Sequence, residues 1–289
     1  MRIGALEAGG TKMVCAIGNE KGEILERQSF PTETPEITLP KLVAYFEERN
    51  IEALGIGCFG PIDLHQDSDT YGYITTTPKI AWQNCNIVGA FEKLQVPIGF
   101  DTDVNGSVLG EHTWGSAKGL ESCIYITIGT GIGVGIISDG QLLHGMLHPE
   151  GGHILLAKHP KDVYKGKCPF HKNCFEGLCA GPALEERWGK PGIELVENKE
   201  VWEMEAYYIA QALVDYVMML SPQKIILGGG VMHQEQLFPL IREKFKEMLN
   251  GYIDTKELEN LDNYIVPPSL EDNQGIMGAI QLALLALGK

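Results

Sequence analysis

The stretch that decides the fold is IGALEAGGTKMVCAI, at residues 3–17. An apolar run reaches a glycine-rich bend at residues 8–12, and a second apolar run follows directly. Two apolar runs joined by a short glycine-containing bend predict a β-hairpin. The pattern returns as CIYITIGTGIGVGII at residues 123–137, with its own bend at residues 129–133.

Each predicted hairpin is followed by a helix and then by a strand that ends in glycine. In the first half these are residues 39–48 and 53–57, and in the second half residues 201–220 and 224–230. Apolar residues three or four positions apart support the longer helix, on one face: Val201, Met204, Tyr208 and Ala212. The repetition predicts a duplicated α/β unit with a cleft between the copies. The alternative is that hairpin, helix and strand follow one another in any α/β protein.

The domain boundaries follow from this repetition. We predict a smaller α/β domain at residues 1–117 and a larger one at residues 118–274, and we expect the apolar helix at residues 275–289 to pack back on the first domain. The length of 289 residues suits about two domains at roughly 150 residues each.

Charge and hydropathy exclude several classes of protein. The chain has 23 basic and 38 acidic residues, a net charge of −15, which disfavours nucleic acid as a partner. No uncharged stretch reaches the roughly 18 residues of a membrane span, so we expect no membrane association. Most of the seven cysteines are scattered through apolar context, which suits reduced thiols in the cytoplasm.

The first bend carries groups that suit a phosphate. Gly9, Gly10, Thr11 and Lys12 offer backbone N–H groups, a hydroxyl and an ammonium within one turn. The bend is not a P-loop, because a strand rather than a helix follows it. The alternative is a glycine hairpin with an exposed lysine.

A second candidate is the acid-rich segment at residues 100–106, FDTDVNG, which follows an apolar run and precedes a predicted helix. An acid at the carboxyl end of a strand is well placed to accept a proton from a bound alcohol. The alternative is a helix N-cap, which Asp and Asn favour.

The most specific motif is Cys168-x-x-His171-x-x-Cys174. Sulfur and imidazole ligands at two-residue gaps are typical of tetrahedral zinc, which needs a fourth ligand when it is structural. The candidates are His153, His159 and Cys179, and we favour His153, which follows Glu150-Gly151-Gly152. The alternative is a set of core thiols and a surface imidazole.

Two carboxylates flank this predicted metal loop. Glu150 and Glu176 could accept hydrogen bonds from neighbouring sugar hydroxyls if the metal fixed their positions. Outside such a loop they would be ordinary solvated glutamates.

Taken together, these segments resemble the ROK family of sugar kinases, within the actin and hexokinase-like superfamily, and most closely its fructokinase branch. The resemblance covers nearly the whole chain and implies two duplicated ribonuclease H-like α/β domains. One departure is Glu7, where many relatives carry Asp. The Cys-x-x-His-x-x-Cys spacing resembles the fructokinase branch.

The resemblance implies a role for each matching residue. Asp103 would be the general base, and the sugar would be held by Asn105, Glu150, His153 and Glu176. Structural Zn²⁺ would be bound by His153, Cys168, His171 and Cys174. ATP, with Mg²⁺, would lie against Gly9, Gly10, Thr11, Lys12, Thr130, Gly131, Gly133, Pro182, Gly229, Gly230 and Gln234.

The expected activity is transfer of the ATP γ-phosphoryl group to a hexose, with fructose first and mannose, glucose or an N-acetyl amino sugar as alternatives. A non-catalytic sugar-binding protein of the same family is the other alternative. Family regulators carry a helix-turn-helix segment ahead of the first bend, and here that bend begins at Ala8. Aromatic residues expected to be exposed on the long helix, Trp202, Tyr207 and Tyr216, are compatible with a homodimer.

Overall fold

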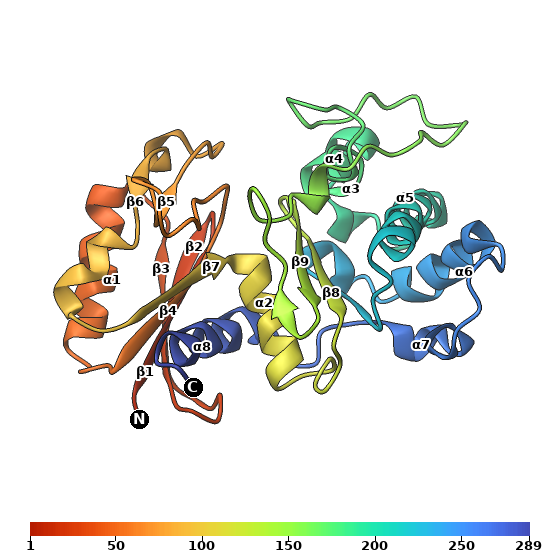
Figure 1. The fold of residues 1–289 in the computed structure, drawn as a ribbon. Coiled ribbons are helices and arrows are strands. Elements are labelled where there is room, and N and C mark those ends of the chain that lie inside the picture. The colour runs from red at the N-terminus through yellow and green to blue at the C-terminus, as the bar shows by residue number, and fades with distance from the viewer. The chain divides into compact units, whose positions relative to one another are not determined.

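The computed structural model describes all 289 residues, which form two compact units. Unit 1 comprises Met1–Gly119, Leu142–His148 and Ser269–Lys289, and unit 2 comprises Leu120–Gln141 and Pro149–Pro268. Each unit contains its own five-stranded sheet (Figure 1). The chain therefore leaves unit 1, returns to it briefly after the second hairpin, and ends in it.

The sheet of unit 1 has the order β3-β2-β1-β4-β7. Its strands are β1 (Ile3–Ala8), β2 (Lys12–Gly18), β3 (Ile24–Pro31), β4 (Ala53–Cys58) and β7 (Ile98–Thr102). The first three strands pair antiparallel, and β1 pairs parallel with β4, which pairs parallel with β7. The predicted hairpin at residues 3–17 is confirmed.

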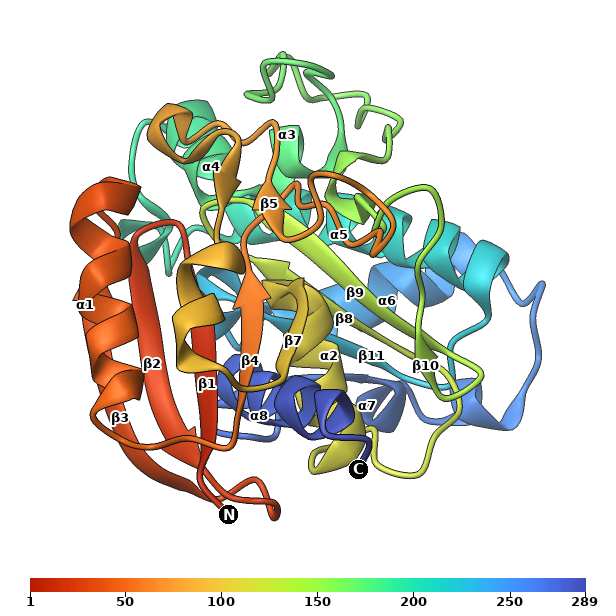
Figure 2. The same ribbon diagram turned by 60° about the vertical axis from the view of Figure 1, so that its left-hand side comes forward.

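Helices α1 (Pro35–Glu47) and α8 (Gln274–Ala286) cover opposite faces of this sheet (Figures 1 and 2). Phe46 of α1 packs with Leu6 and Ile56 in one core, and Ile280 of α8 packs with the strand residues of the other core. Helix α1 begins four residues before the predicted start, because Pro35 stands in its first turn, where the fixed φ of proline favours a helix.

Helix α8 lies unusually close to its neighbours. A Cβ at Gly55 of β4 would lie 1.7 Å from the carbonyl oxygen of Ala279, and a Cβ at Gly278 would lie 1.7 Å from the carbonyl oxygen of Gly106. Gly106 belongs to α2 (Asp103–Thr113), which crosses α8. These contacts require glycine, since any side chain would separate the backbones.

The rest of unit 1 consists of short elements between β4 and β7. They are β5 (Tyr73–Ile74), η1 (Ile80–Trp82), β6 (Cys85–Asn86) and η2 (Gly89–Leu94). Strands β5 and β6 form a separate two-stranded sheet. Trp82 is buried there, and its Nε1 donates to the carbonyl oxygen of Glu33 at 2.8 Å.

The sheet of unit 2 has the order β10-β9-β8-β11-β12. Its strands are β8 (Cys123–Ile128), β9 (Ile132–Ser138), β10 (Gln141–Leu142), β11 (Ile225–Gly228) and β12 (Ile265–Val266). Strand β8 pairs antiparallel with β9 and parallel with β11, which pairs parallel with β12. The strand order repeats that of unit 1, which confirms the predicted duplication.

Unit 2 is completed by helices and short turns. They are η3 (Gly151–His153), α3 (Phe175–Cys179), α4 (Gly181–Trp188), η4 (Gly192–Glu194), α5 (Lys199–Leu220), η5 (Gly230–His233), α6 (Leu237–Leu249), η6 (Lys256–Glu259) and α7 (Leu261–Tyr264). The long helices α5 and α6 pack on one another. None of the helices is both long and apolar enough to serve as a membrane span.

One expectation about α5 is wrong. Trp202 and Tyr216 are buried, and only Tyr207 of the three aromatic residues is partly exposed. Trp202 donates from Nε1 to the carbonyl oxygen of Leu195 at 2.9 Å, and the Tyr216 hydroxyl donates to the carbonyl oxygen of Gly151 at 2.7 Å. Both rings fill the interior because their polar atoms find backbone partners there, so they give no support to a homodimer.

Candidate functional site

The first glycine-rich bend, between β1 and β2, is closed by its own backbone. Gly9 N donates to the carbonyl oxygen of Lys12 at 3.1 Å, and Thr32 Oγ1 donates to the carbonyl oxygen of Gly9 at 2.8 Å. Thr11 and Lys12 are exposed. A Cβ at Gly10 would lie 3.1 Å from Lys79 Cε, so a second lysine lies against the bend. No local sequence pattern marks Lys79 as a site residue, because only the fold brings it to the bend.

Asp103 is the first residue of α2, directly after β7. Thr102 is the N-cap, because its Oγ1 accepts a hydrogen bond from Asn105 N at 3.1 Å. Asp103 accepts one from Val104 N at 2.9 Å. The capping role that the sequence suggested for an acidic residue therefore falls to a threonine, which leaves the second carboxylate oxygen of Asp103 for chemistry.

Burial raises the pKa of Asp103 to about 6, against the opposing effect of the Val104 N–H. Burial also raises the pKa of Glu7, and the neighbouring charge of Asp103 raises it further, while Arg27 and Lys12 lower it. Glu7 thus interacts electrostatically with both Asp103 and Lys12 within unit 1. A carboxylate with a pKa close to neutrality is suited to act as a general base.

Asp101 is a second buried acid in the same segment, and its oxygens are satisfied. Oδ1 accepts from Thr102 N at 2.8 Å and from Asn105 Nδ2 at 2.7 Å, and Oδ2 pairs with His144 Nε2 at 2.8 Å. The hydrogen bond with Asp101 raises the pKa of His144. Asn105 is fully buried. Sequence reasoning missed His144, because the contact spans 43 residues of chain.

A cavity of about 350 Å³ lies beside this pair in unit 1. Its lining includes Tyr71, Phe100, Asp101, His144 and His148. The segment Leu142–His148 reaches unit 1 at this point. His148 Nε2 accepts a hydrogen bond from Ile62 N at 3.2 Å, which fixes the end of the segment.

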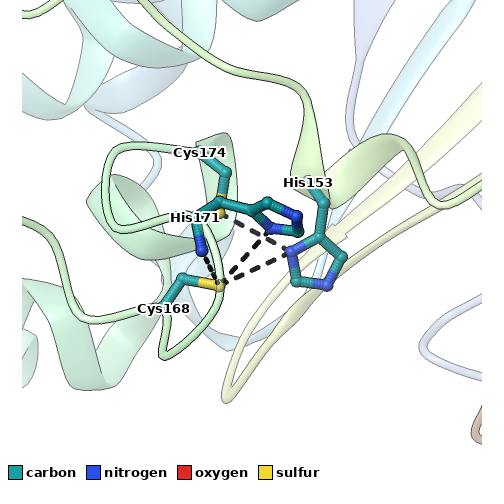
Figure 3. Close-up of side chains that lie close together, drawn as sticks. All are labelled: His153, Cys168, His171 and Cys174. Atoms are coloured by element: carbon teal, nitrogen blue, oxygen red, sulfur yellow. Dashed lines mark hydrogen bonds between the residues drawn. The ribbon is translucent and has the colours of Figure 1, made fainter.

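The Cys/His motif forms one compact cluster in unit 2 (Figure 3). One ligand atom from each of His153, Cys168, His171 and Cys174 lies within 4.8 Å of the others. His153 Nδ1 lies 3.8 Å from Cys168 Sγ and 3.6 Å from Cys174 Sγ, and His171 Nδ1 lies 3.7 Å from Cys168 Sγ. The edges of a tetrahedral zinc site with sulfur and nitrogen ligands measure about 3.3–3.8 Å, so this donor set could hold such a metal.

Local backbone contacts orient the sulfur atoms. Cys174 is the N-cap of α3, where its Sγ accepts from Gly177 N at 3.3 Å. His171 N donates to Cys168 Sγ at 3.5 Å. Burial raises the pKa of Cys174 to about 12, and the neighbouring Cys168 contributes to the rise. A bound cation would therefore be needed to keep the Cys174 sulfur as a thiolate.

Several segments of unit 2 lie against the second glycine-rich bend, which joins β8 and β9. Gly181 N donates to the carbonyl oxygen of Gly129 at 2.7 Å, which places Pro182 beside the bend. A Cβ at Gly229 would lie 2.5 Å from the carbonyl oxygen of Ile128. A Cβ at Gly129 would lie 3.8 Å from Gly230 N. The predicted nucleotide residues of this unit therefore gather at one bend, with Gln234 at the end of η5.

Two of the segments that carry the predicted sugar residues of unit 2, η3 and α3, contact the same bend. Glu150 precedes η3, and its carbonyl oxygen accepts from His153 N at 3.0 Å. A Cβ at Gly152 of η3 would lie 1.9 Å from the carbonyl oxygen of Ile132. Glu176 Oε2 accepts from Ile132 N at 3.0 Å. The predicted residues thus form two groups: Asp103 and the first bend in unit 1, and the remaining bend, the acids and the Cys/His cluster in unit 2.

Comparison with known proteins gives a consistent result. Residues 3–286 match the ROK family. A fructokinase of Streptococcus mutans serotype c is 48% identical over 292 residues, covering 99% of this chain and 97% of its own. A fructokinase of Pediococcus pentosaceus is 47% identical over 288 residues, covering 99% of each chain.

The fold has solved relatives as well. The crystal structure of a ROK hexokinase from Thermus thermophilus superposes with a TM-score of 0.80 at 26% identity, over 100% of this chain and 99% of that one. The resemblance seen in the sequence is confirmed, and the chain belongs to the ROK family.

Proposed function

We propose that this chain is an ATP-dependent fructokinase, which transfers the γ-phosphoryl group of ATP to fructose and yields fructose 6-phosphate. The observation that carries the proposal is Asp103, a carboxylate with a pKa of about 6 at the carboxyl end of β7, in a chain nearly half identical to proteins named fructokinase.

In unit 1, Asp103 accepts the proton of the attacking sugar hydroxyl. Phosphoryl transfer depends mainly on positioning and charge neutralisation, because its transition state is loose. The amide of Gly10, with Thr11 and Lys12, contacts the phosphates, while Gly9 closes the bend through its hydrogen bond to the carbonyl oxygen of Lys12. Lys79, which lies against Gly10, adds positive charge at the same bend.

In unit 2, the bend residues Thr130, Gly131 and Gly133 and the neighbouring segments with Pro182, Gly229, Gly230 and Gln234 border the nucleotide. Their convergence around Gly129 supports this assignment. Glu150, His153 and Glu176 hold the sugar. Asn105 of unit 1 is buried, so it contributes to the sugar site indirectly, by donating a hydrogen bond from Nδ2 to Asp101.

The metal assignments rest on donor chemistry. The two thiolates and two imidazoles of the Cys/His cluster suit structural Zn²⁺, with all four ligands supplied by protein. Mg²⁺ accompanies ATP and neutralises phosphate charge when bound. The seven free cysteines suit a reducing, cytoplasmic environment.

A coupled ADP-release assay tests the proposal. Purified protein with ATP and Mg²⁺ is offered fructose, mannose, glucose and N-acetylmannosamine, and kcat/KM is expected to be highest for fructose. A higher kcat/KM for another hexose would show that this hexose, rather than fructose, is the substrate. If no sugar stimulates ADP release, the protein is a non-catalytic sugar-binding protein.

A further inference from the structure

Glu176 lies at the junction between the sugar residues and the nucleotide bend of unit 2. It belongs to α3, two residues after the metal-ligating Cys174, and its side chain is partly exposed. Its carboxylate contacts the protein backbone, because Oε2 accepts a hydrogen bond from Ile132 N at 3.0 Å. Ile132 is the first residue of β9, at the end of the glycine-rich bend.

The bend is rich in glycine and has one backbone hydrogen bond of its own, from Gly129 N to the carbonyl oxygen of Gly131 at 2.9 Å. Residues 129–133 include three glycines, which lose more conformational entropy on ordering than any other residue type. One end of the bend is held by the hydrogen bond from Gly181 N to the carbonyl oxygen of Gly129 at 2.7 Å. The other end is held by Glu176, and hydrogen bonds to ionised acceptors are the stronger kind.

The backbone also leaves room for the carboxylate. A Cβ at Gly131 would lie 2.8 Å from Glu176 Oε2, so a side chain at this position would require the carboxylate to shift away from the bend. A carboxylate beside a triphosphate cannot serve by charge attraction. Its contribution must therefore be geometric.

We infer that Glu176 is a positioning residue for the nucleotide: through Ile132 N it fixes the bend at residues 129–133 in the form that presents its amides to the phosphates. The inference rests on the proposed function, since it requires the nucleotide to bind at this bend. One oxygen of Glu176 then orders the nucleotide bend, while the other is left for a sugar hydroxyl. Glu176 thereby joins the two substrates within unit 2.

Two substitutions distinguish the effect of the length of the Glu176 side chain from the effect of its charge. Glu176→Asp keeps the charge but shortens the side chain by one methylene, so it loses the contact with Ile132 N. Glu176→Gln keeps the reach and a carbonyl acceptor but loses the charge. Glu185→Gln, at an exposed position of α4, is the matched control.

The experiment is a calorimetric titration of full-length, zinc-loaded protein with Mg·ADP in the absence of sugar. Glu176→Asp is expected to bind Mg·ADP about tenfold more weakly, which is the cost of one lost hydrogen bond to a charged group. Glu176→Gln is expected to stay within about threefold of wild type while its KM for fructose rises. Amide exchange in the segment at residues 128–134 should accelerate in the Asp variant and not in the Gln variant.

Wild-type affinity in Glu176→Asp, with unchanged amide exchange, would overturn the inference and restrict Glu176 to the sugar. Should the Asp variant fail to fold, Glu176→Ala takes its place, because it also removes the acceptor for Ile132 N, and wild-type Mg·ADP affinity with unchanged amide exchange in that variant would overturn the inference. Failure of the wild-type protein to bind Mg·ADP would instead overturn the proposed function.

Discussion

Replacing Asp103 with Asn is expected to stabilise unit 1 while it removes activity. The carboxylate of Asp103 is buried enough to raise its pKa from 3.8 to about 6. At about 1.4 kcal/mol per pH unit, this difference means that the ionised group destabilises the fold by at most about 3 kcal/mol. The side chain keeps some exposed surface, so we expect about half of that value, ~1.5 kcal/mol.

The pH dependence has a definite sign. Above pH 6 the aspartate is ionised in the folded and the unfolded protein, so the full destabilisation is present. As the pH falls from about 6 toward 3.8, the folded state binds the proton first, and wild type approaches the Asn variant in stability. Below about pH 4 the two proteins should be equally stable.

The assay is thermal unfolding followed from pH 4 to pH 8. The Asn variant is expected to melt about 3–6 °C higher than wild type at pH 7.5, with the difference shrinking as the pH falls. Its kcat is expected to be about 10²- to 10⁴-fold lower, because the general base is gone. Asp69→Asn, at an exposed position of unit 1, should change neither property.

A lower melting temperature for Asp103→Asn at every pH would refute the reasoning about burial. A difference that does not depend on pH would show that the change acts through packing rather than through ionisation. Wild-type kcat in the variant would remove Asp103 from the mechanism, whatever its stability.

Three further predictions concern other parts of the molecule. Gly278→Ala should destabilise the protein by about 1–3 kcal/mol in a denaturant titration, because its Cβ would meet a carbonyl oxygen at 1.7 Å, whereas Gly106→Ala, whose nearest neighbour is at 3.7 Å, should be tolerated. Elemental analysis is expected to give one zinc per chain, which Cys174→Ser should lose, with a lower melting temperature, and Cys85→Ser should keep; a full zinc content in the Cys174 variant would contradict the assigned site. His144→Gln should lower the free energy of unfolding by about 0.5 kcal/mol near pH 6, because the pKa of His144 is raised and its pair with the buried Asp101 is then charged. In melting experiments this loss of stability should disappear as the pH rises above the raised pKa. A cost that stays constant with pH would point to packing instead.

Local patterns in the sequence predict much of the fold. The bend at residues 8–12 is flanked by apolar runs that are strands in the structure, and the helix predicted at residues 201–220 is observed as α5. The spacing of Cys168, His171 and Cys174 predicted a Cys/His cluster, because these three residues lie on one tight loop. Such features need only neighbours in sequence, so periodicity and spacing reveal them.

Features that depend on the fold as a whole could not be predicted from the sequence. The position of Lys79 against Gly10 and the hydrogen bond from Ile132 to Glu176 join segments far apart in the chain, and no local pattern marks either contact. The burial of Trp202 was also missed, because an aromatic residue on an amphipathic helix can face either side until its backbone partner is known.

The place of α8 has a consequence for how the chain is made on the ribosome. The apolar residues of β1 and β4 that α8 covers, such as Ile3 and Ala53, are synthesised first, and the helix that shields them comes last. Helix α8 begins about 220 residues after Ala53, so at about 5–20 residues per second these strands wait roughly 10–45 s for their cover. Unit 2 is complete by then, and the nascent first unit must be kept from aggregating meanwhile.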